Sequence, residues 1–206
     1  MELSIFLYTN ILNRKVYDEF GDVLGLLKDV YVTTEEGYPR IIGYKLKKDG
    51  VTFHYEFRYI QFIDNDGKIR MKTRGSKEIL PMRYSYLLSE NLLDKKIVDI
   101  NGKQVVRVND LRIAKLAGEF RVIAVEVGPF ARYRRLKISG LMKILYKIIG
   151  KDIEETVLRW DDVESLEMVN NNLQISVPYK KLSKLHPADL ADILENLDTN
   201  SRKQVL

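Results

Sequence analysis

The stretch LNRKVYDEFGDVLGLLKDVYVTTEEGYPRIIGYKL, residues 12–46, occurs a second time in the chain in diverged form. It aligns without a gap with LDKKIVDINGKQVVRVNDLRIAKLAGEFRVIAVEV, residues 93–127. The matched identities are Lys15 with Lys96, Asp18 with Asp99, Gly21 with Gly102, Asp29 with Asp110, Gly37 with Gly118, Arg40 with Arg121 and Ile42 with Ile123. A period of this length is that of a small domain and is too long for a solenoid repeat. We therefore expect two copies of one fold in tandem.

Each copy has the residue pattern of short β-strands separated by turns. Val, Leu, Ile and Tyr favour strands, and the strict alternation of apolar and polar residues at 51–57 is typical of a half-buried strand. In the first copy, strands are expected at residues 16–17, 23–32, 40–47, 51–57 and 68–72. About five or six short strands in so small a domain predict a closed barrel or a sandwich, because closure protects the strand edges. Residues 74–87 are expected to be an irregular connection, since Pro81 opposes regular structure.

The second copy departs from the first by an insertion between Gly128 and Glu155. In this segment Ile138, Leu141, Met142, Leu145, Ile148 and Ile149 recur at helical spacing. The insertion also carries the candidate interaction residues Arg132, Arg134, Arg135, Lys137, Lys143, Lys147 and Lys151, with no acid among them. The pattern predicts a basic amphipathic helix at residues 137–150.

Three interpretations of this basic insertion are open. The preferred one is that its apolar side covers an open end of the second barrel or packs on a neighbouring subunit. A second is that the helix lies on an anionic membrane surface. A third is that Arg132, Arg134 and Arg135, together with Tyr133, contact RNA, as in a ribosome-associated assembly factor.

Composition excludes several classes of function. The chain of 206 residues has no cysteine, which excludes disulfides and thiolate chemistry and favours a reducing compartment. Neither a signal peptide nor an apolar run long enough to cross a bilayer occurs, so a cytosolic protein is expected. The two histidines, His54 and His186, are expected to be structural, and no phosphate loop, nucleophile elbow or metalloprotease helix occurs. The sequence therefore predicts a non-enzymatic protein with no cofactor in this chain.

The C-terminal residues have the pattern of helices. His186-Pro187-Ala188-Asp189 is typical of a helix start, and Leu190, Ile193, Leu194 and Leu197 form one apolar face. The acids Asp189, Asp192, Glu195 and Asp198 recur every three residues, as a polar face or, alternatively, as magnesium ligands. A second helix that starts at Asp198 and stops at Leu206 would be marginal alone. We interpret the chain as the front part of a longer protein.

Two resemblances follow from these residues. Each repeat resembles a PRC-barrel domain, the small β-barrel of the photosynthetic reaction centre H subunit and of a ribosome maturation factor. The resemblance lies in the openings at 12–21 and 93–102, in Asp29-Val30 and Asp110-Leu111, and in the closing Tyr59 and Trp160 segments.

The second resemblance concerns KLSKLHPADLADILENLDTNSRKQVL, residues 181–206, which is similar to the start of the N-terminal intracellular domain of MgtE-type magnesium transporters. In that family the helical domain precedes CBS domains, and the cytosolic assembly senses magnesium. The resemblance implies a regulatory setting in which magnesium acts on the full-length protein.

The sequence thus predicts a mainly β chain. Its expected parts are a PRC-like repeat at 1–85, a second repeat at 86–180 with the helical insertion, and a helical start at 181–206. The expected function is that of a cytosolic regulatory or adaptor region in magnesium transport or sensing. The expected location is the cytoplasm or, alternatively, the inner face of the membrane. The preferred partners are another protein or downstream domains of the same protein. A second copy of the chain, a membrane surface and RNA are less favoured alternatives.

Overall fold

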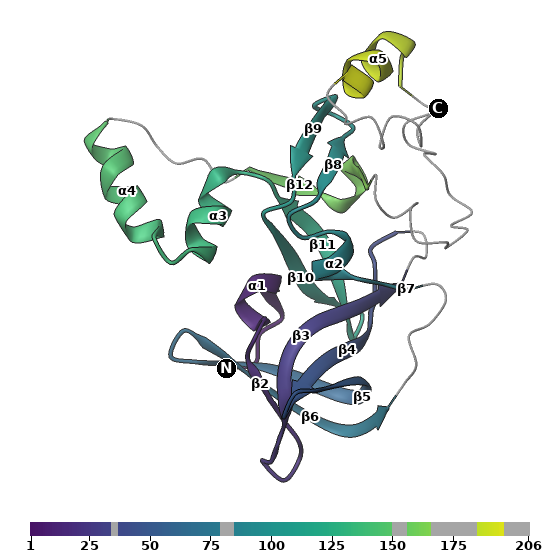
Figure 1. Ribbon diagram of the computed structural model, residues 1–206, viewed down its shortest axis with the longest axis vertical. Coiled ribbons are helices and arrows are strands. Elements are labelled where there is room, and N and C mark those ends of the chain that lie inside the picture. Colours follow the sequence, from purple (N-terminus) through teal and green to yellow (C-terminus); the bar gives the residue numbers. More distant parts are fainter. Residues whose placement is uncertain (34–36, 79–84, 150–155, 166–184, 196–206) are drawn as a thin grey trace. The chain divides into compact units, whose positions relative to one another are not determined.

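The computed structural model describes residues 1–33, 37–78, 85–149, 156–165 and 185–195 (Figure 1). Contacts divide the chain into two compact units, which we describe separately. Unit 1 consists of Met1–Asn91 and Arg112–Ile123, and unit 2 of Leu92–Leu111 and Ala124–Leu206. A segment of the second sequence copy therefore belongs to unit 1. The two units are defined by contacts in the structure. The predicted ranges 1–85, 86–180 and 181–206 were defined by sequence similarity. The two divisions are not equivalent, so the predicted domain ranges stay a prediction.

Unit 1 contains a closed five-stranded β-barrel. Its strands are β2 (Lys15–Tyr17), β3 (Val23–Thr33), β4 (Ile41–Lys48), β5 (Val51–Asn65) and β6 (Lys68–Glu78). They pair in the order β2-β6-β5-β4-β3, and a further pairing of β2 with β3 closes the ring. Only the pairing of β2 with β6 is parallel. The predicted mainly β fold with a small barrel is confirmed for this part of the chain.

Two of the barrel strands are longer than predicted. The pairing of β5 with β6 extends from Asn65 with Lys68 to Tyr55 with Glu78. The expectation of an irregular connection at 74–87 is therefore wrong at both ends, because β6 ends at Glu78 and a further strand, β7, occupies Ser85–Leu87. Cross-strand contacts support the extension, since the Arg74 guanidinium lies 4.9 Å from the centre of the Tyr59 ring.

The core of unit 1 combines residues of both sequence copies. The Phe62 ring lies 4.3 Å from that of Phe6 and 4.8 Å from that of Phe120, measured between ring centres. Leu27, Leu46 and Met71 are fully buried in the same unit. Because Phe120 comes from the second copy, the segment 112–123 is part of this core.

Within unit 1, a short strand from each sequence copy pairs with a strand of the other copy. Strand β1 (Ile5–Leu7) of the first copy pairs with β10 (Asp110–Leu116), and β7 of the second copy pairs with β3. The two pairings are similar but differ by one residue in register: Leu7 lies opposite Arg112, and Leu87 lies opposite Tyr31, the repeat equivalent of Arg112. Arg40 forms a β-bridge with its own repeat equivalent, Arg121. The exchange therefore has a pseudo-two-fold arrangement.

Unit 2 consists of short strands and helices. Strands β13 (Val163–Ser165), β8 (Lys96–Asp99) and β9 (Gln104–Arg107) form a three-stranded sheet, and β12 (Val157–Arg159) pairs with the end of β11 (Glu119–Glu126). The helical elements of the chain are α1 (Tyr8–Ile11), α2 (Leu88–Asn91), α3 (Pro129–Arg135), α4 (Ser139–Ile148), η1 (Trp160–Asp162) and α5 (Pro187–Glu195). Over the described ranges, the strands of unit 2 do not close into a ring. Nor does the structure contain, in those ranges, a helix long and apolar enough to span a membrane.

The sequence repeat is matched by repeated local hydrogen bonds. The backbone N–H of Asn13 donates to the carbonyl of Leu27 at 2.8 Å, and Asp94 donates to Val108 at the same distance. The carboxylates of Asp29 and its equivalent Asp110 each accept a bond of 2.8 Å from the next backbone N–H. Equivalent positions of the two copies therefore form the same local hydrogen bonds.

Candidate interaction surface

Helices α3 and α4 carry the predicted basic residues, and both lie in unit 2. Helix α3 begins with Pro129, whose fixed backbone angle suits the first turn of a helix. After Leu136 the chain turns at Lys137, which has φ of +59°, and α4 starts at Ser139. The predicted helix at 137–150 is thus observed at residues 139–148, whereas α3 was not predicted.

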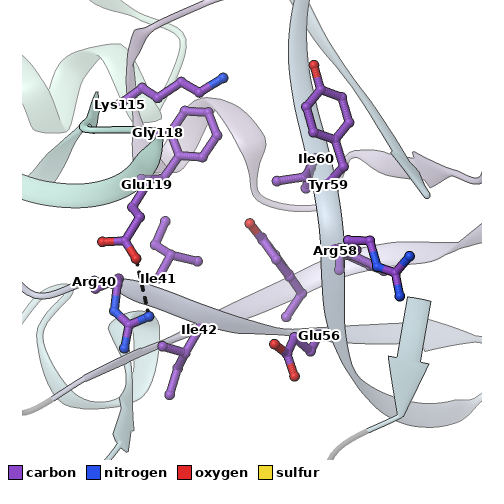
Figure 2. A pocket seen from close by; sticks show the side chains of 13 residues that line it. Arg40, Ile41, Ile42, Glu56, Arg58, Tyr59, Ile60, Lys115, Gly118 and Glu119 are labelled. Atoms are coloured by element: carbon purple, nitrogen blue, oxygen red, sulfur yellow. Dashed lines mark hydrogen bonds and ion pairs between the residues drawn. The ribbon is translucent and has the colours of Figure 1, made fainter. Parts of the chain in front are cut away.

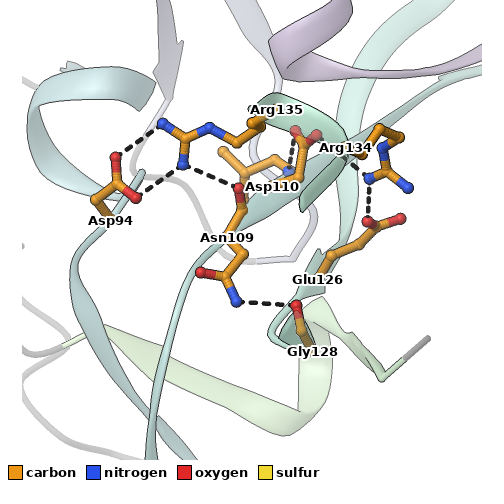
Figure 3. Close-up of polar contacts among 8 residues, drawn as sticks. Asp94, Asn109, Asp110, Glu126, Gly128, Arg134 and Arg135 are labelled. Carbon is orange, nitrogen blue, oxygen red and sulfur yellow. Dashed lines mark hydrogen bonds and ion pairs between the residues drawn. The ribbon is translucent and has the colours of Figure 1, made fainter. Parts of the chain in front are cut away.

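Arg134 anchors α3 to two buried carboxylates (Figure 3). Its guanidinium donates to Glu126 at the end of β11 and lies 3.5 Å from Asp110 at the start of β10. The side chain of Asp110 is fully buried and that of Glu126 is 5% exposed. A buried carboxylate is costly unless it is paired, so Arg134 contributes to the neutralisation of the two acids.

Arg135 forms a second anchor on the next position of α3. Its two terminal nitrogens donate to the two carboxylate oxygens of Asp94 at 2.7 and 2.9 Å, and one of them also donates to the carbonyl of Asn109 at 3.1 Å. The hydrogen bond with Arg135 lowers the pKa of Asp94, and the same bond raises the pKa of Arg135. A two-pronged pair of this kind fixes orientation as well as distance. The helix is therefore held in a defined orientation within unit 2.

Helix α4 packs through a narrow side. Ser139, Met142 and Tyr146, which recur at helical spacing, are half-buried. Tyr146 shares a hydrogen bond with Tyr133 of α3, which raises the pKa of Tyr133. The ammonium of Lys143 lies 4.9 Å from the centre of the Phe130 ring, also in α3. Helix α4 is therefore attached to α3.

The apolar side of α4 faces solvent. Leu141 is 67% exposed, Ile144 61% and Ile148 76%, and no residue of the helix is buried. Further exposed apolar side chains border them, namely Leu136, Ile138, Leu145 and Ile149. We call these seven residues the α4 apolar face. The preferred prediction named two alternatives for this side. The first, that it covers the end of a barrel, is wrong for the described residues, because the helix packs through its more polar side. The second, that it packs on a neighbouring subunit, stays a prediction.

The predicted interaction residues fall into two groups. Arg132, Lys137, Lys143 and Lys147 are exposed around α3 and α4. Arg134 and Arg135 are engaged by Glu126, eight residues earlier, and by Asp94, 41 residues earlier. The sequence pattern did not reveal these partners, because Glu126 precedes the insertion at the end of β11 and Asp94 is distant along the chain. Lys151 lies outside the described residues.

Unit 1 contains a pocket of about 280 Å³ (Figure 2). It is lined by Arg40, Ile41, Ile42, Tyr44, Glu56, Phe57, Arg58, Tyr59, Ile60, Lys115, Gly118, Glu119 and Phe120. Glu119 accepts from Arg40 at 3.3 Å and from Arg121 at 2.6 Å, and the bond from Arg121 is the main cause of the lowered pKa of Glu119. The pocket thus combines apolar walls with the ion pair between Arg40 and Glu119, both of which belong to unit 1.

Asp189 of α5 and the two histidines have partners within the protein. Asp189 pairs with Lys103 at 2.7 Å, and Ile193 is buried against Val98. His186 accepts a hydrogen bond of 3.3 Å from Ala188 at the start of α5. Across the described ranges, no group of three or more acids or histidines is arranged to hold a metal ion, and Asp198 lies outside those ranges. His54 hydrogen bonds with the Tyr31 hydroxyl at 3.0 Å.

Comparison with known families identifies the first barrel. Residues 4–78 match the family model of the PRC-barrel domain. They contain β1 and all five strands of the closed ring, so this part of the chain is a PRC-barrel domain. The predicted resemblance is thereby confirmed for the first copy. No curated protein matches the chain.

Proposed function

We propose that this chain is a non-enzymatic adaptor region that binds other macromolecules and belongs to a regulatory assembly for magnesium transport or sensing. The observation that carries the adaptor role is the α4 apolar face, which is held outward by the anchors on α3. Exposed apolar side chains that cluster on one element mark interaction sites. An anchored surface also binds at lower entropic cost than a mobile one, because less freedom is lost on binding.

The link to magnesium comes from the C-terminal residues. The similarity of residues 181–206 to the MgtE-type intracellular domain supports it, and in the structure α5 starts within the similar motif, at Pro187. Helix α5 packs on unit 2 through Ile193 and is tied to Lys103 through Asp189. In this proposal α5 couples the region before it to a magnesium-sensing domain after it. The second sequence copy, at 86–180, is proposed to be a diverged PRC-barrel repeat.

Hydrogen exchange of the full-length gene product tests the magnesium link. Adding MgCl2 is expected to change amide exchange in α5 and in β8 and β9, relative to NaCl at equal ionic strength. Ile193→Asp removes the buried contact of α5 and is expected to abolish the change in β8 and β9. Phe20→Asp is the matched control, because Phe20 is exposed and belongs to unit 1, outside α4 and α5. Exchange that is identical with and without magnesium in the full-length protein would contradict the link.

A further inference from the structure

Helix α4 is oriented in the opposite way from most surface helices of globular proteins, whose apolar stripe normally faces the core. Here the half-buried positions are Ser139, Met142 and Tyr146. Leu141, Ile144 and Ile148, on the other side of the helix, are more than half exposed. Since exposing large apolar side chains costs about 1.5–3 kcal/mol each relative to burial, an outward apolar stripe favours an occupant that removes it from water.

Among the described residues of the insertion, the charges on α4 and directly before it are all positive. Lys143 and Lys147 lie between the packed side and the apolar side of α4, and Lys137 precedes the helix. The sequence contains no acid from Val127 to Ile149. Lysines that flank an apolar stripe extend their charged ends toward a polar boundary while their stems lie along apolar surface. This arrangement suits an occupant that is apolar inside and anionic at its surface.

Two proteinaceous occupants fit less well. Helix α5 is amphipathic and acidic, but its apolar side chain Ile193 is already buried against Val98 and its Asp189 is paired with Lys103. A second copy of α4 would place the lysines of both helices around one apolar seam, where like charges repel. Charge complementarity therefore favours a different surface.

We propose that α4 docks on an anionic membrane surface, lying in the interface with Leu141, Ile144 and Ile148 in the acyl boundary and Lys137, Lys143 and Lys147 at the headgroup phosphates. Basic amphipathic helices bind bilayers in this way through buried apolar area and attraction to anionic lipids. A helix of ten residues is about 15 Å long, so one copy supplies weak, reversible attachment. The anchors through Arg134 and Arg135 fix the helix before it meets the membrane. This docking rests on the adaptor role proposed above and names an anionic membrane as the partner of the α4 apolar face.

Sedimentation of the full chain with lipid vesicles tests the proposal. The probes are vesicles of neutral phosphatidylcholine and vesicles in which about a third of the lipid is phosphatidylglycerol. Binding is expected to the anionic vesicles only, and it is expected to weaken as salt rises, because salt screens the attraction. Equal binding to both vesicles, or binding to neither, would overturn the proposal.

Paired variants separate the apolar and the electrostatic contributions. Leu141→Asp and Ile148→Asp are each expected to lower the partition coefficient about tenfold or more. Lys143→Gln and Lys147→Gln are each expected to lower it about fivefold. The matched controls are Phe20→Asp, at an exposed apolar residue of unit 1, and Lys48→Gln, at an exposed lysine of the same unit. Controls that reduce binding as much as the α4 variants would refute the assignment to this helix.

Light scattering on the protein without vesicles measures its oligomeric state, which tests whether a second copy covers the α4 apolar face instead of a membrane. A chain that is dimeric in solution and becomes monomeric in Leu141→Asp would show that a second copy covers the face, which overturns membrane docking. Binding to a single-stranded RNA in place of vesicles would do the same. These outcomes are independent of the magnesium test, because that test measures exchange in α5, β8 and β9. The magnesium link and the membrane docking can thus each fail while the other holds.

Discussion

Replacing Arg134 by methionine is expected to destabilise unit 2 by about 3 kcal/mol. Methionine keeps an unbranched apolar stem, so the substitution mainly removes the charge. Arg134 contributes to the neutralisation of Asp110, whose side chain is fully buried, and Glu126, whose side chain is 5% exposed. Removing one partner from a buried ion pair costs about 3–5 kcal/mol, because the other charge stays buried without compensation. The lower end applies, since the side chain of Arg134 is itself 24% exposed.

Urea unfolding followed by tryptophan fluorescence measures this loss. Trp160 is the single tryptophan of the chain and belongs to unit 2, so its emission reports on that unit. The double variant Glu126→Gln, Arg134→Met removes one of the two stranded charges and is expected to recover about 1–2 kcal/mol. The matched surface control is Arg159→Met, because Arg159 pairs with Asp162 at 2.8 Å but its side chain is 74% exposed. That control is expected to cost less than about 1 kcal/mol.

Two results would refute the reasoning. A loss below about 1 kcal/mol for Arg134→Met would mean that water or other partners compensate the two acids when Arg134 is removed. A loss for Arg159→Met as large as that for Arg134→Met would mean that burial of the acids is irrelevant.

Three further predictions concern the barrel, the turns and the buried tyrosines. Phe62→Ala is expected to destabilise unit 1 by about 3–5 kcal/mol, measured as a lower midpoint of thermal unfolding, because the Phe62 ring is fully buried. Gly102→Ala is expected to cost about 1–2 kcal/mol in the same assay, since its Cβ would collide with the Asp99 carboxylate, whereas Gly140→Ala in the open part of α4 is expected to be neutral or stabilising. Burial raises the pKa of three tyrosines, Tyr8, Tyr44 and Tyr86. Their contribution to stability is therefore complete below the unfolded tyrosine pKa of about 10 and falls as pH rises above it, so ultraviolet titration should show these phenolates forming only with unfolding.

The sequence predicted the barrel well because its signals are local. The alternation at 51–57 depends on neighbouring residues, and the predicted strand is part of β5. The sequence repeat pairs Asp29 with Asp110, and both carboxylates accept the same local hydrogen bond. The lengths of β5 and β6 were underestimated, because cross-strand partners such as Arg74 and Tyr59 add support that a single strand does not reveal.

The internal contacts of the basic insertion could not be predicted from its sequence, for a physical reason. The run of basic residues suggested that all of its arginines face an external partner. Arg134 and Arg135 instead pair with Asp110 and Asp94, which lie 24 and 41 residues earlier in the chain. Nothing in the local sequence distinguishes an arginine with such a distant partner from an exposed one. The amphipathic pattern of α4 was correct, but which side faces solvent depends on packing against α3.

The decisive measurement is a cysteine-labelling scan of α4 on vesicles. The chain has no cysteine, so single cysteines at positions 141, 147 and 148, and at 20 as control, each carry one fluorescent label. We predict that anionic vesicles shield the labels that replace Leu141 and Ile148 from an aqueous quencher and leave those at Lys147 and Phe20 accessible. Labels at Leu141 and Ile148 that stay as accessible with vesicles as without them would contradict the claim that the α4 apolar face is the docking surface.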